Sequence, residues 1–191
     1  MQTLRTAIDA VLPLPDEEWE AMLACWHSVS YKRKTVITAA GDTERYAYFV
    51  LDGLQRAFCL AEGERDVTLV FSYTGSFAGI IDSFFLQQPS RYYFETLTHS
   101  SFLRITYADI RRLAETYPLI ARWIHLSTVH ALAGIMERHV EALSLDAGQK
   151  FRRLLSRSPH VPQLIPHKYL ASYLGIDPAT FSKLLGGRRL Q

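Results

Sequence analysis

Residues 167–185 read HKYLASYLGIDPATFSKLL, and this stretch determines how the C-terminal part of the 191-residue chain folds. Ala171 is small where a second helix must cross closely, and Gly175 is placed to end the first helix in the left-handed conformation. Asp177 can cap the next helix, with Pro178 at its first position. A small residue, a glycine four positions later and an apolar residue six beyond that predict a helix-turn-helix.

The charge of the chain is unevenly distributed along its length. In total, 21 Lys and Arg stand against 19 Asp and Glu, a formal charge of +2. Residues 146–191 hold eight basic and two acidic residues, or +6, so residues 1–145 carry −4. This partition is typical of a basic module that binds a polyanion, joined to an acidic module with another role. The alternative is a solubilising surface on a minor lobe.

We expect the basic module to bind double-stranded DNA, with its second helix in the major groove. The polar side chains of that helix are candidates for contacts to bases or phosphates, and the flanking basic residues for contacts to phosphates. The alternative is a helical hairpin with a structural role. The candidate DNA-binding residues are Lys168, Asp177, Ala179, Thr180, Ser182, Lys183, Arg188 and Arg189.

Periodicity predicts one long helix from Pro118 to about Ser144, with two apolar faces. Two apolar faces need two partners, so we expect the preceding module on one face and a second copy of the chain, forming a homodimer, on the other. The alternative is a helix buried within its own chain. The coiled-coil seam that would form the dimer interface is Leu126, Val129, Ala133, Met136, Val140 and Leu143. The second face is Ile120, Ile124, Thr128, Ala131 and Ile135.

Short β-like runs separated by glycines occupy the chain from Ser28 to Thr106 and predict an antiparallel sandwich or barrel. Asp52-Gly53 fits a tight hairpin turn between two of them. The expected strands are 35–38, 46–51, 54–60, 66–73, 92–97 and 102–106. The expected helices outside the long one are 4–26, with a start at Asp16, 107–117 and 146–156, followed by a loop at 158–162.

The glycine-flanked segment GSFAG at residues 75–79, the long helix and the C-terminal helix pair together resemble the cyclic-AMP receptor protein/FNR (Crp/Fnr) family of bacterial transcription regulators. The resemblance covers essentially the whole chain. It implies an α+β fold: an N-terminal double-stranded β-helix (a cyclic-nucleotide-binding-like β-roll) in residues 1–117, a dimerisation helix in 118–145 and a winged helix-turn-helix in 146–191. It also implies RNA polymerase as a further candidate partner.

Three details refine this resemblance. The stretches around residues 149–155 and 168–175 are similar to members from the Bacteroidetes branch. The second helix of the pair carries Pro178, Ala179 and Lys183 where the best-known members have an Arg-Glu pair and a later Arg, so we expect a different operator. The chain ends soon after GGRR at residues 186–189, so we expect the wing to be short or missing.

The sensor region departs from family members that bind cyclic nucleotides. Those members carry a Glu after the glycine-flanked segment, which accepts the ribose hydroxyls, and later an Arg followed by small residues, which holds the phosphate. Here Ile80 replaces the Glu, and bulky tyrosines follow Arg91. We therefore expect that cyclic AMP is not the effector and that the pocket binds a less polar molecule or nothing. The candidate effector-pocket residues are Phe77, Gly79, Ile80, Arg91, Tyr92, Tyr93, Thr128, Leu132 and Ile135.

Metal and disulfide chemistry have little support in the composition. Cys25 and Cys59 are too few for a disulfide framework, a cysteine metal site or an iron–sulfur cluster. His125, His130 and His139 follow one another at spacings of five and nine, which do not bring them together on one helix face. We therefore expect no bound metal or haem.

Other classes of function are excluded on similar grounds. The chain has no uninterrupted apolar run of about 18 residues, and its N-terminus lacks a small-residue cleavage site, so we expect no membrane association and a cytoplasmic protein. No residues resemble a catalytic triad or a nucleophile elbow, so we expect no enzyme. We expect no cofactor apart from an unidentified small-molecule effector. The alternative function is a small-molecule-binding or protein-interaction module without DNA binding.

Overall fold

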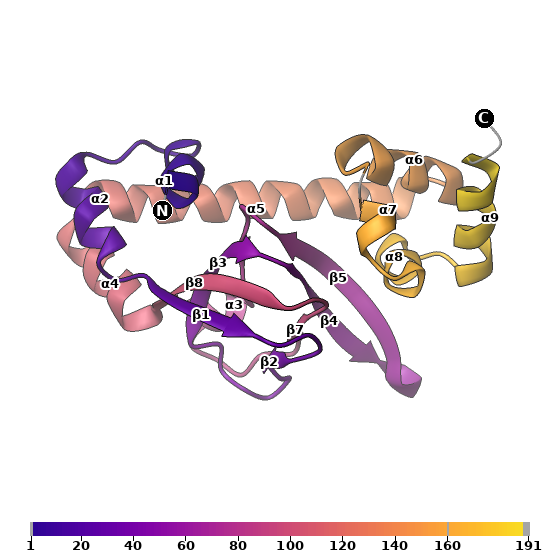
Figure 1. Ribbon diagram of the computed structural model, residues 1–191, viewed down its shortest axis with the longest axis horizontal. Coiled ribbons are helices and arrows are strands. Elements are labelled where there is room, and N and C mark those ends of the chain that lie inside the picture. Colours follow the sequence, from indigo (N-terminus) through magenta and orange to yellow (C-terminus); the bar gives the residue numbers. More distant parts are fainter. Residues whose placement is uncertain (1, 160, 189–191) are drawn as a thin grey trace.

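A computed structural model describes residues 2–159 and 161–188 of the chain (Figure 1). The fold is α+β, with a β-roll below the middle of a long helix, α5, and further helices at both ends of it. The helices are α1 (Gln2–Asp9), α2 (Asp16–Leu23), α3 (Ile81–Leu86), α4 (Tyr107–Thr116), α5 (Pro118–Ser144), α6 (Ala147–Arg157), α7 (Val161–Leu164), α8 (His167–Leu174) and α9 (Pro178–Arg188). The strands are β1 (His27–Tyr31), β2 (Val36–Thr38), β3 (Tyr46–Asp52), β4 (Leu54–Ala61), β5 (Arg65–Tyr73), β6 (Phe77–Ala78), β7 (Tyr93–Thr96) and β8 (Ser100–Thr106).

The roll consists of two four-stranded antiparallel sheets, ordered β1-β8-β3-β6 and β2-β7-β4-β5. Side chains alternate between the two faces of a strand, so β3 directs Tyr48 and Val50 between the sheets and Phe49 outward. Tyr48 and Val50 join Phe94 and Phe102 in the core between the sheets. Phe49 belongs to a second core, formed with α1, α2, α4 and the start of α5. The expected sandwich is confirmed, and helices cover the outer face of its first sheet.

The turn between β3 and β4 is the expected Asp52-Gly53 hairpin. Gly53 has a φ of +99°, which favours glycine. A Cβ at this position would lie 2.5 Å from both the His99 carbonyl oxygen and the Ser100 hydroxyl oxygen. Only glycine fits here, because both the conformation and the close approach of the neighbouring backbone exclude a side chain.

The long helix α5 has the bounds that the sequence predicts. Its first half packs against its own chain: Ile120 and Trp123 are buried, and the Trp123 indole donates to the Ile8 carbonyl at 3.2 Å. The expected dimer seam lies on the other face, where Val129, Met136, Val140 and Leu143 are 44%, 54%, 58% and 76% exposed. Ala133 is also exposed, and Leu126 is half-buried. One apolar face of α5 is therefore covered in its first half, and the other face is open.

By length and composition alone, α5 is apolar enough to cross a membrane. The sequence predicts no membrane span by the criterion of an uninterrupted apolar run, because Arg122, His125 and His130 interrupt this helix. The helix does meet the looser criterion of length and mean hydropathy. One helix of this kind is weak evidence for a membrane span, since buried helices of globular proteins pass the same test. The packing of its first half on the roll accounts for part of its apolar surface.

The helix pair α8–α9 is built as the sequence predicts. Gly175 ends α8 with a φ of +63°, and the Asp177 carboxylate caps α9 by accepting from the Ala179 amide at 2.7 Å. Ala171 and Phe181 are fully buried where the two helices cross. Phe181 also meets the Phe151 ring of α6 edge-on, with centroids 5.5 Å apart. These contacts confirm the caps and the close crossing.

Two expectations about the elements are wrong, those for residues 4–26 and 158–162, and one helix was not expected. The helix expected over 4–26 is two helices, because Pro13 and Pro15 lie between them and proline cannot continue a helix. The sequence reasoning missed α3, and α7 begins inside the expected loop at 158–162. The glycines at 186–187 lie within α9, whose Leu184 and Leu185 pack on the C-terminal core, so the described residues contain no wing strand. Arg189 lies outside the described residues.

The C-terminal helices are fastened to the roll at Arg56 of β4. Its guanidinium lies between the rings of Phe58 and Tyr169, 4.0 Å and 3.8 Å from their centroids, and Tyr169 belongs to α8. It donates two hydrogen bonds to Asp66, at 2.5 Å and 2.6 Å, and one to Glu95 at 2.6 Å. Burial alone would lower the pKa of Arg56, but the hydrogen bonds that it donates to these carboxylates, together with their negative charge, outweigh burial and raise it. Arg56 is thus held charged inside the protein.

A second contact continues this junction along β5. The Ser172 hydroxyl of α8 accepts from the Thr68 amide and donates to the Asp66 carbonyl, both at 2.9 Å. The rings of Phe71 and Tyr173 pack beside it, with centroids 5.2 Å apart. Strand β5 is at the edge of its sheet, and α8 covers this edge. The contacts between α8 and β5 determine how α8 is oriented on the roll.

Arg56→Met should lower the free energy of unfolding by about 3 kcal/mol, because it leaves the Asp66 and Glu95 carboxylates without their buried partner. The matched control is Arg111→Met, which breaks a surface pair with Glu115 whose two side chains are each 65% exposed, and should cost less than about 1 kcal/mol. Urea denaturation of both variants measures the difference. Equal effects of the two substitutions would contradict the assigned role of Arg56.

Candidate functional site

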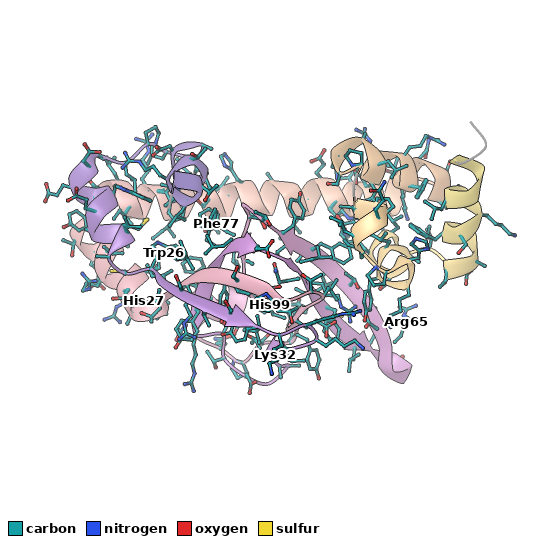
Figure 2. All side chains as sticks on the ribbon, viewed as in Figure 1. Trp26, His27, Lys32, Arg65, Phe77 and His99 are labelled. Carbon is teal, nitrogen blue, oxygen red and sulfur yellow. The ribbon has the colours of Figure 1, made fainter. Side chains whose placement is uncertain are left out.

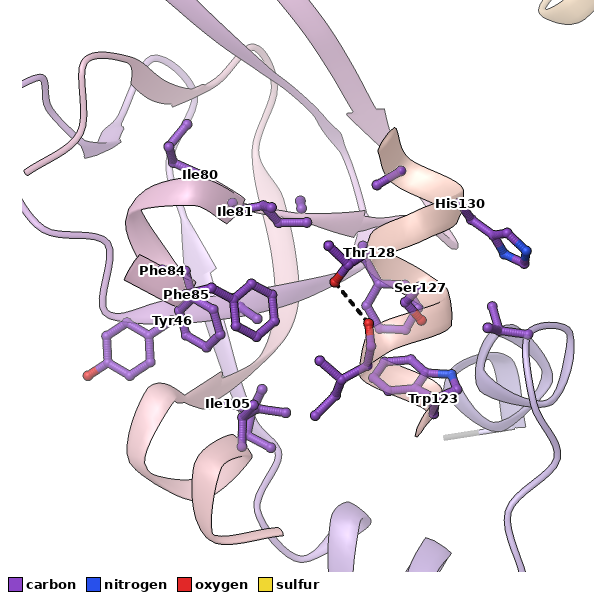
Figure 3. Close-up of a pocket in the computed structure, with 18 of the residues that line it drawn as sticks. Tyr46, Ile80, Ile81, Phe84, Phe85, Ile105, Trp123, Ser127, Thr128 and His130 are labelled. Atoms are coloured by element: carbon purple, nitrogen blue, oxygen red, sulfur yellow. Dashed lines mark hydrogen bonds between the residues drawn. The ribbon is translucent and has the colours of Figure 1, made fainter. Parts of the chain in front are cut away.

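A cavity of about 320 Å³ lies between the β3–β6 edge of the first sheet, α3 and α5 (Figure 3). Its walls are mainly aromatic and aliphatic, with no Lys, Arg, Asp or Glu among the lining residues. The aromatic side chains that line it, apart from His130, are Trp26, Tyr46, Phe77, Phe84, Phe85 and Trp123. Figure 2 shows Trp26 and Phe77 where the roll meets the helices, and their ring centroids are 6.4 Å apart. The cavity is suited to an apolar molecule.

The structure brings together four of the nine expected pocket residues. Phe77, Gly79, Ile80 and Thr128 line the cavity, the first three from the β6–α3 segment and the last from α5. Ile80 is 3% exposed, so the position of the expected ribose-binding Glu is an apolar part of the wall. The five other expected residues are not among those that line it: Arg91, Tyr92, Tyr93, Leu132 and Ile135.

Strand alternation and helix length explain why three of these five residues lie away from the cavity. Tyr93 lies on the outer side of its sheet, where its ring stacks on Phe58 at 4.9 Å. Arg91 is exposed and lies over the ring of its neighbour Tyr92, 5.6 Å from the centroid. Leu132 and Ile135 are 56% and 65% exposed, because α5 continues past the end of the cavity.

The sequence reasoning missed Glu44, a carboxylate buried next to Ile80. Its carboxylate accepts from the Thr38 hydroxyl at 2.7 Å, the Tyr46 amide at 3.2 Å and the Ile80 amide at 3.4 Å. Burial raises the pKa of Glu44, and these hydrogen bonds only partly oppose the increase. Nothing in the sequence around position 44 indicates burial, since a charged residue in a polar loop is usually exposed. The carboxylate is occupied by the protein's own donors.

Aromatic rings fill the space between the two sheets. The Tyr48 ring lies 5.7 Å from that of Phe94 and 5.4 Å from that of Phe102, measured between centroids. Tyr48 is 1% exposed, and burial raises the pKa of its hydroxyl above the usual value. The interior of the roll is therefore packed core, and the cavity lies at its edge, toward α5.

The second candidate site is the outward face of α9. Ala179, Ser182 and Lys183 are exposed on it, whereas Thr180 is half-buried. Asp177 caps the helix, as described above, so its carboxylate is engaged within the protein. The Ser182 hydroxyl donates to the Pro178 carbonyl at 3.0 Å, which leaves its oxygen as an acceptor. The structure thus groups three of the expected residues on one face.

The basic residues near α9 differ in whether their charge is exposed or paired within the chain. Lys168, at the start of α8, is exposed, with its ammonium 4.6 Å from the centroid of the Tyr169 ring. Arg157 of α6 forms ion pairs with Glu137 and Glu141 of α5, so its charge is balanced within the chain. Arg188 and Arg189 are the two expected phosphate contacts at the C-terminus. Arg188 ends α9, but its side chain lies outside the described part of the chain, and all of Arg189 lies outside it.

Residues 28–117, which span the roll and α4, match the family model of the cyclic nucleotide-binding domain. None of the curated proteins compared with the chain is significantly similar to it in sequence. The likeness to Bacteroidetes members therefore stays a prediction. Similarity beyond the domain comes from solved structures, and those described below have low sequence identity.

Three of these structures match most of the chain. FixK2 from Bradyrhizobium japonicum has a TM-score of 0.77 and 18% identity, over 87% of this chain and 85% of that one. The c-di-GMP-responsive global regulator CLP from Xanthomonas campestris has a TM-score of 0.70 and 18% identity, over 92% of each chain. The catabolite activator protein of Thermus thermophilus has a TM-score of 0.61 and 20% identity, over 95% and 85%. The chain therefore carries a cyclic nucleotide-binding-type domain in residues 28–117, and its fold is that of Crp/Fnr-like regulators.

Proposed function

We propose that the protein is a homodimeric, DNA-binding transcription regulator in which α8 and α9 form the helix-turn-helix. The observation that carries this proposal is the placement of α9. Its buried side packs on α8 and α6 through Phe181, and its polar side is exposed at the end of the molecule away from the roll (Figure 1). A capped, solvent-facing helix on a basic module fits the major groove.

The residues of α9 then divide by role. Its N-terminal turn approaches the base edges, with Ala179 offering a methyl group and Ser182 an acceptor oxygen. Lys183 contacts a base or a phosphate, and Lys168 at the start of α8 contacts a phosphate. Contacts from Arg188 and Arg189 belong to the same proposal.

The homodimer in this proposal forms along the open apolar face of α5. The helix has 27 residues and is about 40 Å long, so it carries the roll near its middle and the DNA-binding helices at its C-terminal end (Figure 1). Two half-sites lie about 34 Å apart, and paired α5 helices would set the distance between the two copies of α9. The dimer also covers apolar side chains that are otherwise exposed.

The route from sensor to DNA runs through the contacts of α8. Because Arg56, Ser172 and Tyr169 fix α8 to the roll, a change in the roll or in α5 reaches α9 directly. Effector binding would shift the population between two orientations of the helices. A roll without an effector would leave a constitutive DNA-binding protein. Cytoplasmic location, RNA polymerase as a further partner and the absence of catalytic activity belong to the same proposal.

DNA binding should weaken steeply with salt, because the protein displaces counterions from phosphates. Lys183→Ala should reduce the slope of log K against log salt by about one, measured by fluorescence anisotropy on genomic fragments. The matched control is Lys32→Ala, which removes an exposed lysine of the roll and should leave the slope unchanged. Absence of any salt-dependent binding would overturn the proposal and favour a binding or interaction module without DNA.

Dimerisation predicts that Val129→Glu combined with Met136→Glu yields monomers in analytical ultracentrifugation, because charges would face each other across the seam. Ala142→Glu is the control, since Ala142 is exposed on the opposite face of α5. An unchanged mass for the double variant would show that α5 does not form the interface.

Cyclic AMP should produce no binding heat in calorimetry. Ile80 offers no hydrogen bond to a ribose, Arg91 is exposed and not among the residues that line the cavity, and aromatic rings fill the roll. Tight binding of cyclic AMP that Arg91→Ala abolishes would refute this exclusion. It would leave the DNA-binding proposal intact.

A further inference from the structure

Helix α6 carries four basic side chains and no acidic one, and the four lie in different surroundings. Arg157, at its end, is paired with two glutamates of α5, and Lys150 is half-buried. Arg152 and Arg153 are exposed. The guanidinium groups of these two form no hydrogen bond or ion pair with the other described residues. Both charges are therefore available to a partner outside the chain.

The side of α6 that lies beside α9 is identified by Gly148. A Cβ at Gly148 would lie 3.9 Å from Cδ2 of Leu184 in α9 and 3.4 Å from Nη1 of Arg152. Residues four apart are neighbours on a helix surface, so Arg152 shares the side of Gly148. Phe151, one residue before it, meets the Phe181 ring of α9 edge-on, with centroids 5.5 Å apart. The Arg152 guanidinium therefore lies on the flank of α6 next to α9.

Arg153 points in another direction. Successive residues of a helix are rotated by about 100°, which places Arg153 about 140° around the axis from Gly148 and nearly opposite Phe151. Its side chain is thus directed away from α9. The two arginines are neighbours in sequence, both exposed and both unpaired among the described residues, but only Arg152 lies beside α9.

The spacing of packed helices determines what α6 would meet on DNA. The axes of two packed helices lie about 8–10 Å apart, and the major groove is about 12 Å wide, so it admits α9 but not its neighbour. Figure 1 shows α6 beside α9 at the end of the molecule away from the roll. With α9 in the groove, the flank of α6 next to it would lie over the phosphate backbone that forms the groove wall.

We propose that Arg152 contacts a DNA phosphate beside the groove that α9 enters, so that the DNA-binding surface extends from α9 onto α6. A guanidinium can donate two parallel hydrogen bonds to a phosphate, and such a contact positions the protein without reading sequence. The inference rests on the proposed function, because it assigns a second element to the same DNA interface. The Asp146 carboxylate at the start of α6 accepts from the Gln149 amide at 2.8 Å and makes no ion pair with Arg152 among the described residues.

The test is a salt titration of the full chain by fluorescence anisotropy. The probe is a labelled DNA duplex of mixed sequence, long enough to span two half-sites about 34 Å apart, because a phosphate contact needs no particular sequence. Arg152→Gln should reduce the slope of log K against log salt by at least about 0.9, the value for one lost phosphate contact. Raising the salt from about 50 to 200 mM should then weaken the variant about 3.5-fold less than the wild type. Arg152→Lys keeps the charge and should retain most of the slope.

Arg153→Gln is the matched control. It removes the same charge from the next residue of the same helix, so it changes the net charge equally but removes no contact beside α9. Its slope should equal that of the wild type. Thermal melts of the three variants verify folding, and they should match the wild type because both side chains are exposed.

Three outcomes would overturn the inference and leave the DNA-binding proposal in place. The first is an unchanged slope for Arg152→Gln, and the second is an equal reduction for Arg152→Gln and Arg153→Gln. The third is a loss of affinity on one duplex sequence but not on another of the same length, which would indicate a base contact. Absence of salt-dependent binding by the wild type would instead overturn both proposals, so the wild-type titration distinguishes the two failures.

Discussion

The buried guanidinium of Arg56 is the contact on which the arrangement of this protein depends. It joins β4 to β5 through Asp66 and to β7 through Glu95, and it carries the Tyr169 ring of α8 on its open face. A charge this deeply buried is tolerated only when it is paired, so Asp66, Glu95 and the Tyr169 ring must all be in place around Arg56 in the folded protein. The same residue thereby holds the second sheet together and fixes the helices proposed to bind DNA.

The long helix α5 divides two tasks between its two faces. One face closes the cavity with Trp123, Ile124 and Ser127, and the other exposes a row of apolar side chains from Val129 onward. A ligand on the first face and a second subunit on the other would act on the same rigid rod. In this proposal, no other element is needed to connect ligand binding at the roll to the dimer interface.

Local chemistry made much of the fold predictable. Pro118 begins α5 because proline suits the first helical position, and Gly175 with Asp177 defines the turn between α8 and α9 through conformation and capping. The missed features depend on residues that are distant in sequence. Glu44 is buried among Thr38, Ile80 and Ser83, and Arg91 is exposed beside Tyr92 and is not among the residues that line the cavity.

The sequence by itself therefore determined the order and bounds of most elements, the helix pair with its caps, and the apolar row along α5. These depend on backbone conformation, on capping and on periodicity, which act between near neighbours. Only the tertiary structure decided where the cavity lies and that α8 is docked on the roll. Those features arise where residues distant in sequence, such as Arg56 and Tyr169, come together across the fold, and no local sequence pattern indicates such contacts.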